Sequence, residues 1–215
     1  NGGLAANYSI STGQTTTADV TAKSLTVSGI TASDKTYDAN IVATLVSTSV
    51  VYTGLVAGDD FTGTYTGVFD NANVGTGKTV TITPTYNGTD TSNYTVTDQS
   101  STTANIIFKT LTATASSSDK TYDATNAATT TLTLSGLVGT ETLNVTNTST
   151  FNNKNVGTGK SVTVNSITLA DGTGLAANYS ISPGQTTTAN ITAKALTVSG
   201  ITASNKTYDG NAVAT

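Results

Sequence analysis

The sequence predicts an all-β protein made of tandem modules of about 85 residues joined end to end. Residues 3–38 return almost unchanged at 174–209, and a diverged third copy lies between them. Tyr37, Tyr122 and Tyr208 are consequently 85 and 86 residues apart. Short runs of Thr, Val, Ile and Leu alternate with polar residues, and no stretch shows helical periodicity. This period is too long for one turn of a solenoid and fits a small self-contained domain.

The repeat period divides the chain into four parts. Residues 1–22 are interpreted as the C-terminal part of a preceding repeat, and residues 195–215 as the N-terminal part of a following one. Between them lie two full repeats, 23–109 and 110–194. The chain thus resembles an excerpt of a longer array, so we expect any targeting signal to lie outside it.

The strands of one repeat follow from the alternation of apolar and polar residues in the second full copy. A strand is expected to open at 110–115, where the other copies carry the clearer patterns 25–32 and 196–203. Further strands are predicted at 128–135, 143–151, 161–169, 179–182 and 186–191, separated by turns rich in Gly, Asn, Asp and Ser. Six or seven short strands in one module favour an antiparallel β-sandwich of immunoglobulin-like size.

The segments that join the repeats contain neither Gly nor Pro. They span residues 16–28, 103–114 and 186–199. Flexible linkers are rich in Gly and Ser, and domain boundaries usually show a change of composition. We therefore expect stiff end-to-end stacking of modules, with a rise on the order of 35–45 Å for each one.

Composition excludes several classes of function. The chain has no Cys and no His, so neither a Ser-His-Asp nor a Cys-His catalytic system can form. Asp59 and Asp60 are sequence neighbours and point to opposite faces of a strand, so they do not form a catalytic pair. A net charge of −4 with nine basic residues argues against nucleic acid as a partner, and no apolar run is long enough for membrane insertion. The protein is not expected to be an enzyme.

The recurrent residues are interpreted as structural. Tyr rings of the Tyr-Asp turns are expected to be buried with their hydroxyls bonded to a backbone group, while each Asp closes its turn through an Asx-type hydrogen bond. Glycines in the two Gly-Thr-Gly-Lys segments are expected to be turn residues with positive φ. The predicted structural set is Tyr37, Asp38, Tyr122, Asp123, Tyr208, Asp209, Phe69, Phe151, Gly75, Gly77, Gly157 and Gly159, with the junction lysines Lys23, Lys109 and Lys194.

Three chemical alternatives attach to the same segments. Asp34, Asp38, Asp119 and Asp123 are candidate calcium ligands, although the third copy has Asn205 in place of the first Asp. No other cofactor is expected. A phosphate loop would require Gly where Ala72 and Lys154 stand, and a helix where a strand is predicted.

A Lys–Asn isopeptide bond is the third alternative. Lys78 and Lys160 recur with Asn73 and Asn155, but in each copy the Lys and the Asn lie together in an exposed Gly-rich turn. Such a bond requires a buried apolar setting with a catalytic acid, and the turn does not supply one.

Several motifs occur in a fixed order in each copy. KTYDAN at 35–40, KTYDAT at 120–125 and KTYDGN at 206–211 are accompanied by FDNANVGTGK at 69–78 and FNNKNVGTGK at 151–160. Together they resemble the YDG-type repeats of large bacterial surface adhesins, including filamentous-haemagglutinin-like exoproteins. Two copies depart from the name, with Ala39 and Ala124 where the third has Gly210.

The resemblance implies a secreted protein of the bacterial cell surface. The repeats would form a stalk whose partners are neighbouring repeats of the same chain, while a domain outside this sequence binds a host or cell-surface receptor. The alternative is that each repeat is itself a weak glycan- or protein-binding module acting by avidity. Tyr52, Tyr65 and Tyr86, present only in the first full repeat, are the residues that such a module could use.

Overall fold

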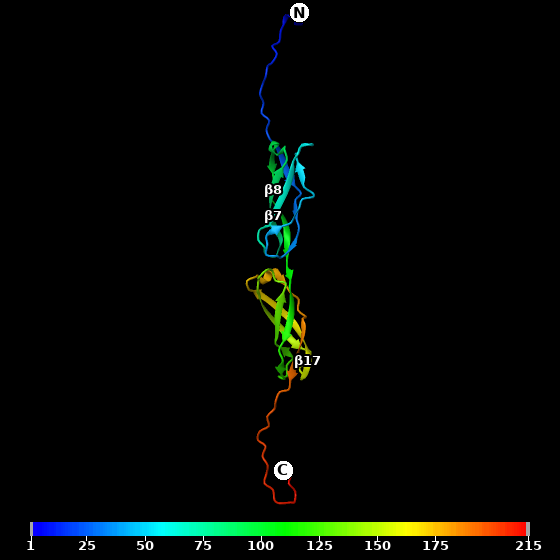
Figure 1. Ribbon diagram of the computed structural model, residues 1–215, viewed down its shortest axis with the longest axis vertical. Coiled ribbons are helices and arrows are strands. Elements are labelled where there is room, and N and C mark those ends of the chain that lie inside the picture. The colour runs from blue at the N-terminus through cyan, green and yellow to red at the C-terminus, as the bar shows by residue number, and fades with distance from the viewer. Residues whose placement is uncertain (1, 214–215) are drawn as a thin grey trace. The chain divides into compact units, whose positions relative to one another are not determined.

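The computed structural model describes residues 2–213 and divides into two compact units (Figure 1). Unit 1 comprises the residues up to Lys35 and Ala39–Ile107, and unit 2 comprises Thr36–Asp38 and the residues from Phe108 onward. Nearly all regular structure is β, which confirms the predicted class, and residues 2–213 contain no α-helix. Three single 3-10 turns occur, η1 (Ala5–Asn7), η2 (Thr91–Asn93) and η3 (Ala176–Asn178).

The first ten strands follow one another in short steps. They are β1 (Lys23–Ser28), β2 (Thr31–Ala32), β3 (Lys35–Thr36), β4 (Val42–Ala43), β5 (Leu45–Val46), β6 (Val51–Thr53), β7 (Thr62–Phe69), β8 (Gly75–Asn87), β9 (Tyr94–Thr97) and β10 (Ser101–Ile107). Strands β7 and β8 form the long antiparallel hairpin at the centre of a five-stranded sheet with the order β3-β10-β8-β7-β4. A second sheet has the order β6-β1-β9, and β2 pairs with β5.

The second sheet of unit 1 differs from the expectation of antiparallel pairing alone. Strand β1 pairs with β6 in antiparallel fashion but with β9 in parallel, from Lys23 opposite Tyr94 to Thr26 opposite Thr97. Parallel pairing requires a long crossover, and the whole remainder of the repeat between β1 and β9 supplies it. The first and last parts of the repeat therefore lie side by side in one sheet.

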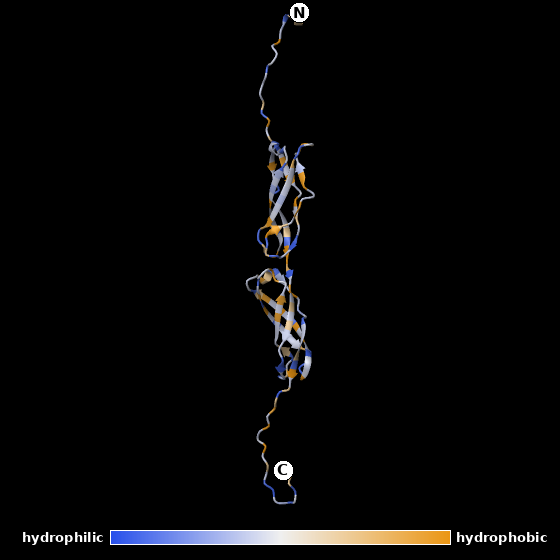
Figure 2. Ribbon diagram, viewed as in Figure 1, coloured by the Kyte–Doolittle hydropathy of each residue, from blue (hydrophilic) through white to orange (hydrophobic). Residues whose placement is uncertain are grey.

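The core of unit 1 lies between its sheets. Val27 of β1 and Ile82 of β8 belong to one buried cluster with Ile30, and both strands alternate buried and exposed residues. Leu25 joins Phe61 and Tyr94 in a neighbouring cluster. Each fully buried aliphatic or Phe side chain stabilises the fold by about 1.5–3 kcal/mol. The alternation of apolar residues with Thr and Ser, visible as short orange stretches on pale strands in Figure 2, thus places one face of each strand inside.

Unit 2 repeats this arrangement with longer hairpin strands. Its strands are β11 (Lys109–Thr110), β12 (Thr112–Ser117), β13 (Lys120–Thr121), β14 (Ala127–Ala128), β15 (Thr130–Ser135), β16 (Leu143–Phe151), β17 (Gly157–Asp171), β18 (Tyr179–Ser180) and β19 (Thr186–Thr192). The five-stranded sheet has the order β13-β19-β17-β16-β14, and two further pairs are β12-β15 and parallel β11-β18. Phe151, Val162, Ala189 and Ile191 form one buried cluster, and Leu111, Leu132, Val164 and Tyr179 are buried as well.

The Gly-Thr-Gly-Lys segments are not the turns that the sequence predicted. They open strands β8 and β17, and the chain turns at residues 70–74 and 152–156 instead. Only Gly77 and Gly159 take a positive φ, +59° in each, while Gly75 and Gly157 do not. The pairing register shifts at both segments, so the second glycine permits a β-bulge.

The outer segments of the chain form no strands among residues 8–22 and 193–213. The strand predicted at 196–203 is therefore wrong for this chain, although its counterpart at 25–32 forms β1 and β2. A β-strand is held by hydrogen bonds to a neighbour, and these segments pair with none of the described residues. The predicted outer parts 1–22 and 195–215 also include residues 1 and 214–215, which lie outside the described residues.

The residue after each Tyr-Asp pair has a left-handed backbone. Its φ is +61° at Ala39, +65° at Ala124 and +74° at Gly210. Left-handed geometry costs a residue with a Cβ roughly 1–2 kcal/mol, which Gly avoids. The first two copies therefore carry backbone strain that the third does not.

We predict that Ala124→Gly stabilises unit 2 by about 1 kcal/mol, because relief of the strain exceeds the greater flexibility of Gly in the unfolded chain. Denaturant unfolding of the full chain measures the change. Ala127→Gly in β14 is the matched control and should lower stability by about 0.5–1 kcal/mol, since Ala127 lies in a strand and outside the left-handed region. A loss of stability in both variants would show that the Ala124 backbone is not strained.

Candidate functional site

Each Lys-Thr-Tyr-Asp turn is closed by its own lysine. In the second copy, Lys120 Nζ donates to Asp123 Oδ1 at 2.8 Å, and to the carbonyl oxygens of Thr125 and Ala127 at 2.9 Å each. The same ammonium lies 5.7 Å from the centre of the Phe151 ring. These contacts tie the loop after β13 to the core aromatic residue. The sequence prediction emphasised the junction lysines and missed this one.

The first copy is closed in the same way. Lys35 Nζ donates to the carbonyl oxygens of Asn40 at 2.9 Å and Val42 at 3.2 Å, and it lies 5.9 Å from the centre of the Phe69 ring. Phe69 and Phe151 are both 2% exposed. The signal that could have identified both lysines was their fixed position two residues before each Tyr.

The second acidic residue of the turn accepts the local backbone hydrogen bond. Asp123 Oδ1 accepts from the Thr125 N–H at 2.9 Å, and Asp209 Oδ1 accepts from the Asn211 N–H at 3.0 Å. The hydrogen bond from Lys120, followed by those from Thr125, lowers the pKa of Asp123 to about 2. Asp38, in the first copy, adds a negative charge beside Tyr37.

The first acidic residue of each turn is bound by an asparagine on the last strand. Asp119 Oδ1 accepts the Asn190 backbone N–H at 2.7 Å, and its Oδ2 accepts Asn190 Nδ2 at 2.8 Å. Asn190 Oδ1 in turn accepts the N–H of the bulge residue Gly159 at 2.8 Å. We call this Asp–Asn–Gly chain of hydrogen bonds the polar relay. The backbone hydrogen bond from Asn190 is the main cause that lowers the Asp119 pKa.

Unit 1 has the same polar relay. Asp34 accepts both the backbone N–H and the Nδ2 of Asn105, at 2.7 and 2.8 Å, and the Gly77 N–H donates to Asn105 Oδ1 at 2.7 Å. The hydrogen bond from the Asn105 backbone likewise lowers the Asp34 pKa. The relay links the turn before β3 to strand β10 and the bulge of β8.

Three of the four candidate calcium ligands lie in two different kinds of hydrogen-bond system. Asp34 and Asp119 accept N–H donors from asparagine, and Asp123 accepts donors from Lys120 and Thr125. Within residues 2–213, no group of three or more acidic, His or Cys side chains is placed to hold a metal ion. The observed geometry therefore assigns these carboxylates to the closure of turns.

The lysines considered for an isopeptide bond have other partners. Lys78 pairs with Asp70 at 2.8 Å and donates to Asn71 Oδ1 at 2.8 Å, while Lys160 Nζ donates to Asn153 Oδ1 at 2.5 Å. The side-chain amides that accept these hydrogen bonds belong to Asn71 and Asn153. Both lysines fasten the hairpin turn that precedes the bulge.

The junction lysines have dissimilar settings. Lys23 opens β1 opposite Tyr94, and Lys109 opens β11 opposite Tyr179. Lys194 lies beyond β19, in a segment without secondary structure. The first two mark the point where the start of a repeat meets the tyrosine near its end.

That tyrosine belongs to a pocket built from a carboxylate and a backbone N–H. In unit 2, Tyr179 Oη donates to Glu141 Oε2 at 2.5 Å and accepts from the Val138 N–H at 3.0 Å. Tyr37, which belongs to unit 2, donates its hydroxyl to Glu141 Oε1 at 2.7 Å. The rings of Tyr37 and Tyr179 meet edge to face, with their centres 5.4 Å apart. One carboxylate therefore binds two phenols.

Tyr37 is buried as predicted, but its hydroxyl partner differs. It is 5% exposed, and the expected backbone acceptor is replaced by the Glu141 carboxylate. Burial is the main cause that raises the Tyr37 pKa, and the hydrogen bond to Glu141 adds to it, while a hydrogen bond with the Asn178 side chain opposes it. Tyr122 is half-buried against the core of unit 2, and Tyr208 is 92% exposed.

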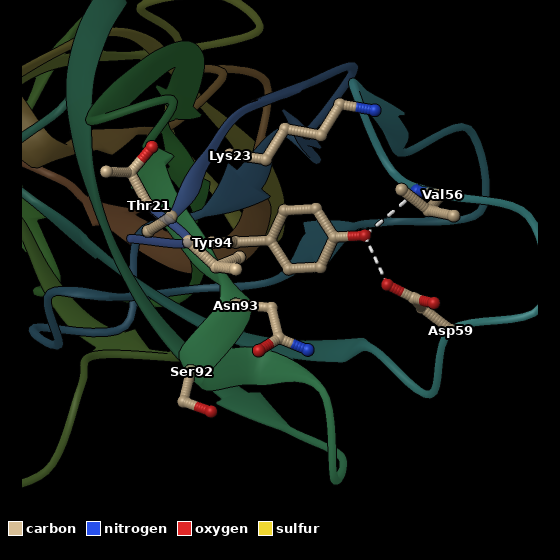
Figure 3. Close-up of a pocket in the computed structure, with 9 residues that line it drawn as sticks. Thr21, Lys23, Val56, Asp59, Ser92, Asn93 and Tyr94 are labelled. Carbon is tan, nitrogen blue, oxygen red and sulfur yellow. Dashed lines mark hydrogen bonds between the residues drawn. The ribbon is translucent and has the colours of Figure 1, made fainter. Parts of the chain in front are cut away.

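Unit 1 has the equivalent pocket, shown in Figure 3. Tyr94 Oη donates to Asp59 Oδ2 at 2.5 Å and accepts from the Val56 N–H at 2.9 Å. Lys23, Ser92 and the other lining residues enclose a volume of about 260 Å³ beside this pair. Chemically, such a site can accept a hydrogen bond from a further hydroxyl and cover its apolar body.

Both units are β-rich and contain corresponding five-stranded sheets. The YDG domain model matches residues 21–104 and again residues 107–189, so the chain belongs to the YDG domain family. Comparison with curated protein sequences and with solved structures gave no match. No helix within the described residues has the length and apolar character needed to cross a membrane.

We predict that the Tyr179 hydroxyl titrates with a pKa of about 12, chiefly because it is buried and also because it donates to Glu141. A pKa raised above that of the unfolded chain stabilises the fold fully below about pH 10, and this stability is lost as the pH rises through 12. NMR of the tyrosine Cζ resonance measures it. Glu141→Gln should lower the pKa yet leave it above 10, because burial is the larger cause. A value near 10 in the unsubstituted chain would contradict this geometry.

Proposed function

We propose that the chain is a run of structural spacer modules, each an immunoglobulin-like β-sandwich, from the stalk of a bacterial cell-surface adhesin. The observation that carries this proposal is the use of the recurrent polar residues. Lys120, Asp119 and Asn190, with their counterparts in unit 1, close the module on itself. Polar residues that form internal hydrogen bonds in both full repeats serve the module and not a ligand.

The small number of charged residues supports the same proposal. A spacer exposed to changing salt benefits from stability that does not depend on surface ion pairs, since these are weak and screened. Only 10% of the residues are charged, and the polar relays include hydrogen bonds between asparagine side-chain amides and aspartate carboxylates, at 2.8 Å in both units. The proposal includes secretion to the cell surface and adhesion by a domain elsewhere in a longer protein, and it assigns no catalytic role.

The rival proposal of a weak glycan-binding module finds less support in the arrangement of its tyrosines. Tyr52 and Tyr65 share a hydrogen bond of 3.0 Å between their hydroxyls, and Tyr86 donates to Asp98 at 2.6 Å. The rings pack on Phe61 and on one another, edge to face or tilted. All three tyrosines are half-buried parts of a cluster, whereas a sugar platform presents a ring face to solvent.

We predict that chains with two, three and four repeats gain maximum dimension linearly in small-angle X-ray scattering. A nearly unbroken strand-to-strand junction without Gly or Pro should resist bending, which gives this linear growth. As a control, four Gly-Ser residues inserted between Ile107 and Phe108 should reduce the dimension and broaden its distribution. Growth with the square root of repeat number in the natural sequence would refute the spacer proposal.

A further inference from the structure

In unit 1, a pocket of about 260 Å³ lies beside Asp59 and Tyr94. We propose that its occupant is the tyrosine of a Lys-Thr-Tyr-Asp turn from another copy of the repeat, located upstream of unit 1 in a longer array. The proposal concerns recognition between modules and does not depend on whether the array serves as a stalk.

The corresponding pocket of unit 2 shows the occupied form. There Tyr37, the tyrosine of such a turn, donates to Glu141 and packs edge to face on Tyr179. Along the chain, this tyrosine precedes the main segment of unit 2, which begins at Phe108. The occupant is thus a turn tyrosine supplied from upstream in the sequence.

The two pockets match residue by residue. Val56 and Val138 donate their backbone N–H to Tyr94 and Tyr179, respectively. The carboxylates of Asp59 and Glu141 each accept a hydrogen bond from the hydroxyl of that same tyrosine. The backbone N–H of each acidic residue donates to the carbonyl oxygen of the valine, at 3.2 Å in unit 1 and 3.0 Å in unit 2. A site that binds a tyrosine in one unit is therefore present in the other.

The differences between the pockets are those expected between an occupied and an open site. Asn178 is 1% exposed in unit 2 and forms a hydrogen bond with the Tyr37 side chain, whereas its counterpart Asn93 is exposed and lines the open pocket. Tyr94 uses Oδ2 of Asp59, and Oδ1 has no hydrogen-bond partner among residues 2–213. In unit 2, both carboxylate oxygens of Glu141 accept a phenol.

The turns that carry the proposed ligand tyrosine are also preformed. Tyr122 follows the lysine-closed strand β13, and its hydroxyl has no hydrogen-bond partner in the described part of the chain. Tyr208 is 92% exposed in a turn that Lys206 closes through Asp209, at 2.8 Å. A turn already held in shape loses little conformational freedom on binding, which favours association.

The test uses a longer chain in which residues 1–193 are followed directly by residues 23–215. The sequence at 194–209 nearly repeats 23–38, so the junction is close to the natural one. Tyr122 of the upstream copy then precedes the Asp59 pocket of the downstream copy. Hydrogen exchange at the downstream Val56 amide, with only that copy isotopically labelled, reports on this pocket alone.

We expect upstream Tyr122→Phe and downstream Asp59→Ala each to accelerate this exchange about fivefold, and the double variant to exchange no faster than the faster single variant. Tyr37→Phe with Glu141→Ala is the positive control, read at the Val138 amide. In the 215-residue chain, Tyr122→Phe should leave exchange at Val56 unchanged, because no turn tyrosine lies upstream of unit 1. Independent, multiplicative effects of the two substitutions in the longer chain would overturn the proposal.

A second measurement needs no substitution in the pocket and so survives any loss of folding in Asp59→Ala. The side-chain amide of Asn93 should exchange about tenfold more slowly in the longer chain than in the 215-residue chain, because an occupant covers it as Tyr37 covers Asn178. Equal rates in the two chains would refute occupation by the upstream tyrosine, whatever the scattering data show about stiffness.

Discussion

Each unit must hold its sheets together with very little apolar volume, and this constraint shapes the rest of the structure. In unit 2, the cluster around Phe151 contains Val162, Ala189 and Ile191, and Leu111, Leu132, Val164 and Tyr179 are buried as well. At about 1.5–3 kcal/mol for each large side chain, a core of this size leaves a limited margin over the loss of chain entropy. The hydrogen bonds that fix the turns and bulges are therefore important for selecting one arrangement of the strands. Lys120, which lies beside the Phe151 ring, and the polar relay hold the turns and bulges at the edge of the apolar core.

The alternating pattern of apolar residues predicted the β class and most strands, because it records which face of a strand is buried. Strand β16 begins and ends at the predicted residues, and β17 contains the predicted run 161–169. The Gly-Thr-Gly-Lys segment was assigned wrongly because glycine signals a turn in isolation. Its actual role depends on Asn190, a residue of β19 far along the chain that accepts the Gly159 N–H. Local sequence does not reveal such a partner.

Nearly identical segments in this chain adopt different structures, which shows how far the fold depends on non-local pairing. Tyr8 and Tyr179 lie in the same Gly-Leu-Ala-Ala-Asn-Tyr-Ser motif, yet Tyr8 is 74% exposed and Tyr179 is 4% exposed. Strand β19 pairs with β17, whereas the equivalent residues 15–21 form no strand. A high strand propensity means only that a side chain fits a half-buried sheet surface. Such a surface exists only where a neighbouring strand pairs with the segment. For the same reason, the sequence pattern did not place tyrosines around Glu141 and Asp59.

The acidic residue of the pocket is Asp59 in unit 1 and Glu141 in unit 2, and the two side chains differ in length by one methylene group. Both carboxylates accept the hydroxyl of the tyrosine at the start of a late strand, Tyr94 or Tyr179, so the shared contact does not require the longer side chain. The added methylene of Glu lets the second oxygen of Glu141 reach Tyr37. In unit 1, the shorter Asp59 would require the tyrosine of an incoming turn to approach its second oxygen more closely. Two repeats of similar sequence can therefore differ in this pocket, because the length of one acidic side chain sets how far its second oxygen reaches.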